Sequence, residues 1–369
     1  MIKILIVLGT RPEIIKLIPV IKELKKYPKQ FRISLCVSGQ HDQLLRPFLN
    51  IFEIKPDYDL RIMKEDQKLK EIFWAVFKKT GEIIKKTKPD WLLVQGDTTT
   101  ALAAAWAAFL AKVKIAHVEA GLRTGDLSNP FPEEANRKIM DHLSDILFAP
   151  TKIAFNNLIK EGIPRRKILL TGNTIIDTLK MFENKPWKAK IKERIILLTV
   201  HRRESFGPKI ENIFEAIRQI AQKHPDIRII FPVHLNPNVK KPAEKILKNI
   251  PNISLIKPLA YMPLLDLLKK SYLVLTDSGG LIEEASYFAK PVIILREKTE
   301  RQESVIKGVA ELAGAEKKNI IRKVTKIISN PQQYKKMSKK FNLYGAGDAA
   351  QIITKYFLKL HHEKKNSHL

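Results

Sequence analysis

The feature that most constrains the fold is a regular alternation of short apolar segments with longer amphipathic ones. Short apolar runs predict strands, and the longer segments between them, with apolar residues at helical spacing, predict helices. Parallel strands need a crossover connection, so strands that alternate with helices predict a parallel sheet covered by helices. The sequence therefore predicts an α/β protein.

The alternation runs through the first half of the chain and then restarts. The strands expected in the first series are Ile2–Leu8, Ile33–Val37, Trp91–Val94, Val113–Val118 and Ile146–Phe148. The helices expected there are Pro12–Lys26, His41–Ile51, Leu69–Lys86, Thr98–Ala111, Glu133–Leu143 and one from Lys152. The second series has strands Arg194–Val200, Ile227–Phe231, Ile253–Ile256, Leu273–Leu275 and Val292–Leu295, and helices Ile210–Lys223, Ala243–Asn249, Pro263–Lys270 and Leu281–Phe288. A polar segment, Asn184–Lys192, separates the two series.

A chain of 369 residues is long enough for two domains. We predict two Rossmann-like, doubly wound domains that face a central cleft. Open α/β sheets bind ligands at the carboxyl ends of their strands, so polar clusters that follow strands are the candidate site residues.

The composition limits the protein class. The single cysteine, Cys36, cannot form an internal disulfide. The longest apolar run, Ala101–Ala111, is too short to span a membrane, and Ile4–Leu8 is too short for a signal peptide. We expect a cytoplasmic protein without a membrane partner.

The charge is strongly positive, with 66 Lys+Arg against 38 Asp+Glu and a formal net charge of +28. This charge favours an anionic partner, from nucleic acid to a phosphorylated metabolite. The lysines, however, are scattered over nearly every predicted helix, without interleaved aromatic residues or zinc-finger spacing. We predict a solvated basic surface, no specific nucleic-acid partner and no metal site.

Polar residues follow the first strand. Gly9 permits a tight turn, Pro12 suits the first helical position, and Arg11 can add a charge-assisted bond to a phosphate at the helix start. The G-x-G-x-x-G dinucleotide fingerprint is absent. A turn with a solvent-facing arginine is the alternative.

Carboxylates follow two further strands. Asp97 lies in Gln95–Thr100, and Glu119 lies in the acidic and basic stretch His117–Arg137. Consecutive strands are usually neighbours, so the two carboxylates can lie close together, which raises one pKa and permits separate acid and base roles. The alternatives are a helix N-cap at Asp97 or Thr98, and plain surface charges in the loop.

The second series carries its own polar clusters. His201 ends the first strand and can bind phosphate or move a proton, and His234 follows the next strand in the same relative place. A salt-bridge cluster is the alternative for His201.

The most informative segment of the second half is Thr276–Ala285. Ser278, Gly279 and Gly280 open a helix after an apolar strand, so that backbone amides can approach a diphosphate. Glu284 can accept bonds from ribose hydroxyls, and Glu283 is expected to be solvated. A plain serine cap is the alternative.

Nine segments resemble, in this order, the non-hydrolysing UDP-N-acetylglucosamine 2-epimerases. They are GTRPEIIK, QGDTTT, HVEAGLRTGDL, PFPEEANR, TGNTIIDT, VHRRESFG, PVHLNPNV, LTDSGGLIEEA and TERQE. The resemblance extends from Lys3 to about Asp348. It implies a GT-B-like fold with domains at 1–170 and 171–347, and a helix at 348–369 that packs back on the first domain. It also implies a homodimer, a role in bacterial or archaeal envelope polysaccharide, a UDP-sugar substrate and no cofactor.

The resemblance implies interconversion of UDP-GlcNAc and UDP-ManNAc by elimination of UDP to 2-acetamidoglucal and re-addition. It implies three groups of site residues. The catalytic group is Asp97, Glu119, Glu133 and His201. The UDP-binding group is Arg11, Lys16, His201, Ser278, Gly279, Gly280, Glu284 and Arg301, with Arg137 as a helper. The residues of a possible activator site are Gln40, Gln43, Gln67, Arg202 and His234.

The chain also departs from the family pattern. Asp66 stands where some relatives have arginine, Gln302 replaces a proline, and Leu343 and Ala346 loosen a common NPYGDG segment. A relative that acts on a UDP-2,3-diacetamido uronic acid shares nearly every motif and is the alternative within the class. A glycosyltransferase has the same fold but needs an acceptor.

Overall fold

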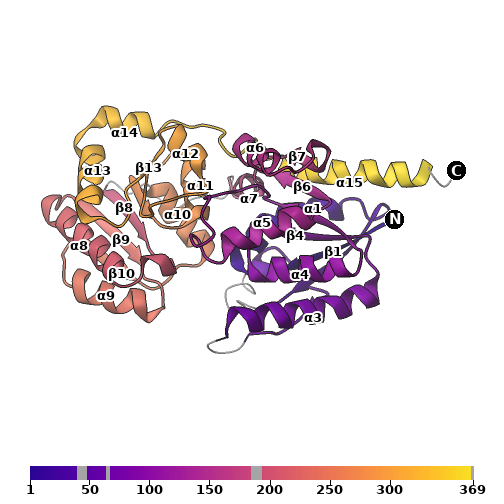
Figure 1. The fold of residues 1–369 in the computed structure, drawn as a ribbon. Helices are drawn as coiled ribbons and strands as arrows, with labels where there is room; N and C mark the ends of the chain where they lie inside the picture. Colours follow the sequence, from indigo (N-terminus) through magenta and orange to yellow (C-terminus); the bar gives the residue numbers. More distant parts are fainter. Residues whose placement is uncertain (40–47, 64–66, 184–192, 367–369) are drawn as a thin grey trace. The chain divides into compact units, whose positions relative to one another are not determined.

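The computed structural model describes residues 1–39, 48–63, 67–183 and 193–366. The chain divides into two compact units, one formed by Met1–Glu183 with Tyr344–Leu369 and the other by Asn184–Leu343 (Figure 1). Each unit contains one parallel sheet with helices around it, which confirms the predicted α/β fold with two domains.

The first unit is built on a seven-stranded sheet in the order β3-β2-β1-β4-β5-β6-β7. Its strands are β1 (Ile2–Leu8), β2 (Phe31–Val37), β3 (Tyr58–Asp59), β4 (Trp91–Gln95), β5 (Lys114–Val118), β6 (Ile146–Ala149) and β7 (Ile168–Leu170). The strand order reverses between β1 and β4, which is the point of an open α/β sheet where ligands bind.

The helices of this unit cover both faces of its sheet. They are α1 (Arg11–Lys25), α3 (Leu69–Thr87), α4 (Thr99–Leu110), α5 (Glu133–Leu143), α6 (Lys152–Lys160), α7 (Thr174–Met181) and α15 (Ala349–Asn366). The central strands are buried on both faces, and β1 from Ile4 to Leu8 and β4 from Trp91 to Val94 therefore form continuous apolar runs.

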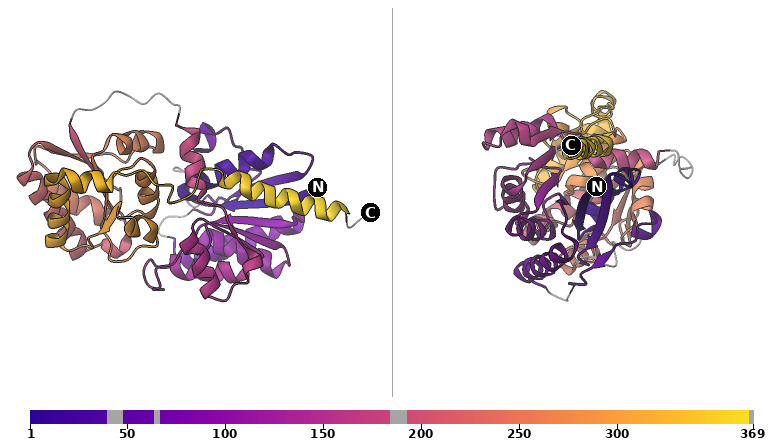
Figure 2. Two further views of the ribbon diagram at one scale, coloured as in Figure 1. Left: turned by 90° about the horizontal axis from the view of Figure 1, so that it is seen from above. Right: turned by 90° about the vertical axis from the view of Figure 1, so that its right-hand side faces the viewer.

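The C-terminal helix α15 packs on the first unit (Figure 2). The ring of Phe357 lies 5.5 Å from Trp91 and 6.2 Å from Phe148, with its side chain fully buried. The amide of Ala350 donates to Asp177 Oδ1 at 2.9 Å, which joins α15 to α7. These contacts tie the end of the chain to its first half.

The unit boundaries differ from those we predicted. Residues 171–183, placed in the second domain from sequence, belong to the first unit because α7 packs on α1, where Thr178 Oγ1 donates to the Ile15 carbonyl at 2.6 Å. Residues 344–347 also belong to the first unit, since the Asn173 amide donates to the Tyr344 carbonyl at 2.7 Å. The polar segment Asn184–Lys192 lies outside the described residues.

The second unit is built on a six-stranded sheet in the order β10-β9-β8-β11-β12-β13. Its strands are β8 (Arg194–Thr199), β9 (Ile227–Pro232), β10 (Ile253–Ile256), β11 (Leu273–Thr276), β12 (Val292–Ile294) and β13 (Ala310–Leu312). Its helices are α8 (Pro208–Lys223), α9 (Pro237–Leu247), α10 (Tyr261–Lys270), α11 (Gly279–Tyr287), α12 (Gln302–Ile306), α13 (Lys317–Ser329) and α14 (Pro331–Met337). The order reverses between β8 and β11, where the predicted polar clusters of this half lie.

Most predicted elements are found within a few residues of their expected ends, apart from the helix His41–Ile51, which falls partly outside the described residues. The elements not predicted are short or follow the predicted series, such as β3, β7 and α12–α14. Helix α9 begins six residues before the predicted start at Ala243, since Pro237 occupies a first-turn position and Pro242 is accommodated inside the helix. No helix in the described part of the chain is both long and apolar enough to cross a membrane.

Candidate active site

The first group of candidate residues lies at the carboxyl edge of the first sheet. The chain leaves β4 through Gly96 at φ 76° and leaves β5 through Glu119 at φ 69°. A positive φ costs little at a glycine but about 1 kcal/mol or more at a glutamate, and such residues cluster at functional sites. The conformation of Glu119 is therefore held by its surroundings.

Glu119 is buried, and its partners among the described residues include two from distant parts of the chain. Its Oε2 forms an ion pair with Lys16 Nζ from α1 and accepts a bond of 3.0 Å from Asn173 Nδ2. Lys16, which the resemblance assigned to UDP, therefore contacts a predicted acid/base carboxylate. An adjacent ammonium favours the carboxylate form of a glutamate over the acid form.

Asp97 is held from α5. Its Oδ2 accepts a bond of 2.8 Å from Arg137 Nη2, and its carbonyl accepts one of 2.8 Å from Asn136 Nδ2. The adjacent Thr98 caps α4 by accepting from the Ala101 amide at 3.0 Å, which decides between the two predicted cap residues. Asp97 and Glu119 each have a basic partner, Arg137 and Lys16.

Glu133 and Glu134 begin α5 and have different environments. Glu133 is half-buried. Glu134 is fully buried, and its two oxygens accept from the amides of Thr124 and Gly125, each at 3.1 Å. Glu134 also lies 3.3 Å from Arg137 Nη1. Glu134, which sequence reasoning did not select, thus fixes the loop after Glu119 and the arginine that holds Asp97.

Glu13 is a second residue that sequence reasoning missed. Its Oε2 accepts from the amides of Gly9 and Thr10 at 3.0 and 2.7 Å and from Thr10 Oγ1 at 2.7 Å. Its Oε1 accepts from Thr98 Oγ1 at 2.9 Å, which joins the loops after β1 and β4. Burial raises the pKa of Glu13 to about 7, although these hydrogen bonds lower it. The spacing Thr10-x-x-Glu13 is a capping-box signature, and this signal in the sequence could have identified Glu13.

In the second unit, Asp277 organises the end of β8. Its Oδ2 accepts from the amides of His201 and Arg202 at 2.8 and 2.9 Å, and its Oδ1 lies 3.2 Å from His201 Nδ1. Burial alone would raise the pKa of Asp277, but the His201 ring and the two amides outweigh it and lower the pKa. The ring of His234 stacks on that of His201 with centroids 5.9 Å apart. The two predicted histidines are thus neighbours.

The start of α11 has the predicted form. Ser278 is the residue before the helix, and the described residues show no capping hydrogen bond from its side chain. A Cβ on Gly279 would lie 2.7 Å from Glu300 Oε1, so a larger residue there would displace the Glu300 carboxylate. A Cβ on Gly280 would have no described atom within 4 Å, so a ligand can approach the backbone there.

Two glutamates of α11 differ from each other. Glu284 is buried and accepts a bond of 2.8 Å from the Tyr261 hydroxyl. The expectation that Glu283 is solvated was wrong, because Glu283 is fully buried and pairs with Arg301 Nε at 2.5 Å. Arg301 also lies 3.4 Å from Glu300, so this predicted UDP-binding residue supplies the charge that buried Glu283 requires.

The sequence matches the UDP-N-acetylglucosamine 2-epimerase family over residues 22–358. The chain belongs to this family. The Campylobacter jejuni UDP-N-acetylglucosamine 2-epimerase is 48% identical over 375 residues, which cover 97% of each chain.

Solved structures of UDP-N-acetylglucosamine 2-epimerases have the same fold. The Neisseria meningitidis enzyme bound to UDP-GlcNAc has a TM-score of 0.92 at 44% identity, covering 97% of this chain and 100% of that one. The Methanocaldococcus jannaschii enzyme in complex with UDP-GlcNAc and UDP has a TM-score of 0.86 at 36% identity, with the same coverage.

The structure also describes the exposure of further family positions in this member of the UDP-N-acetylglucosamine 2-epimerase family. Arg11 is the first residue of α1 and is half-buried. In the predicted activator group, Gln67 and Arg202 are half-buried and His234 is exposed. Gln40 and Gln43 lie outside the described residues, as does Asp66.

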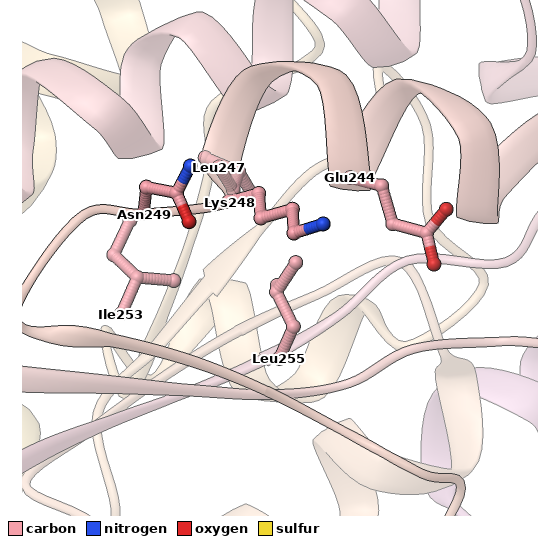
Figure 3. Close-up of a pocket in the computed structure, with 6 residues that line it drawn as sticks. All are labelled: Glu244, Leu247, Lys248, Asn249, Ile253 and Leu255. Carbon is pink, nitrogen blue, oxygen red and sulfur yellow. The ribbon is translucent and has the colours of Figure 1, made fainter.

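A separate hollow of about 270 Å³ lies between α9 and β10 (Figure 3). It is lined by Glu244, Leu247, Lys248, Asn249, Ile253 and Leu255. None of these is a predicted site residue, so the hollow is distinct from the two carboxyl edges.

Glu13 predicts a pH dependence of stability. Its folded pKa of about 7 exceeds the ordinary 4.5, so between these values the folded chain keeps a proton that the unfolded chain loses. Stability therefore falls as pH rises through this window, by about 3 kcal/mol from this residue. Glu13→Gln removes this titrating group. The free energy of unfolding of the variant, relative to that of the wild type, should therefore rise from pH 5 to pH 8 when it is measured by urea unfolding.

Glu23→Gln is the matched control, because Glu23 lies on the same helix and pairs with Lys26 near the surface. It is expected to change stability by less than about 0.5 kcal/mol at both pH values. An equal effect of Glu13→Gln at pH 5 and pH 8 would contradict the assignment.

Proposed function

We propose that the protein interconverts UDP-N-acetylglucosamine and UDP-N-acetylmannosamine by reversible epimerisation at C2 of the sugar. The observation that carries the proposal is the near-full-length identity, 48%, with a relative named for this reaction. Two of the similar solved structures are described as bound to UDP-GlcNAc. The carboxylates and their basic partners at the first sheet edge are the groups that such a reaction needs.

The chemistry at C2 requires more than enolisation, because C2 is not adjacent to a carbonyl. We infer that a base removes the C2 proton while the C1–O bond breaks and its electron pair leaves with UDP. The product is 2-acetamidoglucal, with a double bond between C1 and C2. A proton then adds to C2 from the opposite face and a UDP oxygen attacks C1. The route needs acid/base groups on both faces and retention of UDP.

Three carboxylates of the first unit are proposed for the proton transfers: Asp97, Glu119 and Glu133. The Lys16 ammonium forms an ion pair with Glu119 and so orients its carboxylate. Arg137 orients Asp97 through a bond of 2.8 Å. The assignment of residues to faces stays open.

The residues of the second unit are proposed to hold UDP. Asp277 engages Nδ1 of His201, so that Nε2 is the ring atom that meets the diphosphate. The amides at Gly279 and Gly280 open a nine-residue helix, whose positive end favours an anion. Tyr261 fixes Glu284 toward the ribose hydroxyls. Arg11 at the start of α1 is proposed as a further phosphate contact.

The D2O experiment tests the mechanism. Incubation of the purified protein with UDP-GlcNAc in D2O should give UDP-ManNAc, with deuterium at C2 of both sugars, measured by NMR and mass spectrometry. Occasional release of UDP with the glucal is also expected. Epimerisation without solvent deuterium would reject the elimination route, and turnover of only a UDP-2,3-diacetamido uronic acid would favour the alternative substrate.

Single substitutions test the acid/base residues. Asp97→Asn, Glu119→Gln and Glu133→Gln should each lower kcat by about 100-fold or more, because each removes a proton-transfer group. Glu82→Gln on the exposed side of α3 is the control and should retain the wild-type rate. A near-normal rate for any of the three variants would remove that residue from the mechanism.

We also propose that the protein forms a homodimer. Trp74 on α3 and Trp106, Phe109 and Leu110 on α4 are 64%, 37%, 50% and 59% exposed, and these two helices pack together. Exposed apolar groups of this size mark interaction surfaces. Light scattering should give twice the chain mass of 42.3 kDa. Trp106→Glu with Phe109→Glu should halve that mass, whereas Lys359→Glu on α15 should not.

The resemblance also supports a proposed role in supplying a precursor of envelope polysaccharide. We also propose that the enzyme acts in the cytoplasm, where UDP-sugars are made. A deletion strain should lose the polysaccharide and regain it on expression of the protein.

A further inference from the structure

His117 is a buried residue of β5 to which no role has been assigned. Its Nδ1 lies 2.7 Å from Asp141 Oδ1, and its Nε2 lies 2.7 Å from the Gly96 carbonyl oxygen. The side chains of His117 and Asp141 are both fully buried. Both nitrogens of the ring therefore face oxygen atoms of the protein.

The hydrogen-bond partners of the His117 ring determine which of its nitrogens carry a hydrogen. The Gly96 carbonyl can only accept, so Nε2 carries a hydrogen. Asp141 already accepts on Oδ2 from the Gly121 amide at 3.1 Å and from Arg123 Nη2 at 2.7 Å. Burial would raise the pKa of Asp141, but His117 and Arg123 outweigh it and lower the pKa. Asp141 is therefore an acceptor on both oxygens, and Nδ1 also carries a hydrogen.

Further charged groups lie around the ring. Arg123 forms a second pair with Glu161 of α6, through Nε at 2.9 Å and Nη2 at 2.5 Å. Lys138 of α5 lies 3.4 Å from the same carboxylate. Two cations, His117 and Arg123, thus face two anions, Asp141 and Glu161, with Lys138 at the rim. A buried imidazolium is compatible with this arrangement, because its charge is paired and hydrogen-bonded.

The His117 ring forms a hydrogen bond with the peptide group between Gly96 and Asp97. The Gly96 amide donates to the Val118 carbonyl at 3.0 Å, and the Gly96 carbonyl accepts from His117. Gly96 is thus fixed at both polar groups, while His117 lies on β5 two residues before Glu119, which follows the strand. Bonds from a charged donor are shorter and stronger than neutral ones.

We propose that His117 is a positioning residue that acts as an imidazolium, held by Asp141, and fixes the Gly96 carbonyl and with it the orientation of Asp97. The effect on catalysis rests on the proposed function, in which Asp97 transfers a proton. The protonation of the ring does not depend on that function.

The first test measures the ring directly. In ¹⁵N-histidine-labelled wild-type protein at pH 7.5, both nitrogens of His117 should have the chemical shift of a protonated ring nitrogen and a coupled proton. The spectrum of His117→Gln assigns the resonance among the nine histidines. A non-protonated nitrogen on His117 would overturn the proposal, whether or not the protein epimerises UDP-GlcNAc.

The second test measures catalysis in His117→Gln, Asp141→Asn and the double variant. Each single change should lower kcat about 10- to 100-fold, the cost of a small misplacement of a catalytic group. KM and UDP affinity should stay within about twofold. The double variant should be no slower than the slower single variant, because both substitutions disrupt the same His117–Asp141 interaction.

His142→Gln is the matched control, since His142 is exposed on α5, where its Nδ1 lies 2.9 Å from the Lys138 carbonyl oxygen. It should retain wild-type kcat. An unchanged kcat in His117→Gln, or multiplied losses in the double variant, would overturn the positioning role. If the wild-type protein does not epimerise UDP-GlcNAc, the proposed function is overturned. The NMR experiment then still decides whether the His117 ring is protonated at both nitrogens.

Discussion

The structure depends on the pairing of charges that are buried at the carboxyl ends of parallel strands. At the first sheet edge, Glu119 pairs with Lys16, Asp97 with Arg137, and His117 with Asp141. Removal of one partner from such a pair leaves an uncompensated buried charge, at a cost of about 3–5 kcal/mol. Each pair therefore fixes the loops that carry its members.

These pairs join elements that are distant in sequence. Lys16 comes from α1 and Glu119 from the end of β5, while Arg137 reaches from α5 to the loop after β4. Glu13 adds a link between the loops after β1 and β4. The left-handed conformation of Glu119 is one product of this network, because its cost is met by the ion pair and the bond from Asn173. A site built this way is organised before any substrate arrives, as the proposed proton transfers require.

The second unit uses the same principle with one central anion. Asp277 gathers two amides and an imidazole, and its charge fixes the end of β8 beside the start of α11. Arg301 compensates Glu283 inside the helix layer, which permits a glutamate to lie directly beside Glu284. Two buried acids of this unit, Asp277 and Glu283, thus have a histidine and an arginine as partners near the start of α11.

The sequence by itself determined the class of the fold, because the alternation of apolar runs and amphipathic segments depends only on local spacing. It also located Asp97, Glu119, His201 and Ser278, since residues that end strands or begin helices are marked by the switch in pattern. Only the tertiary structure decided the partners. Glu13 as a link between loops, Lys16 on Glu119, Glu283 inside the core and residues 171–183 in the first unit all follow from contacts between distant segments. The local sequence pattern does not indicate which side chain will pair with a given charged residue. Burial and pairing are determined only when the strands take their order in the sheet.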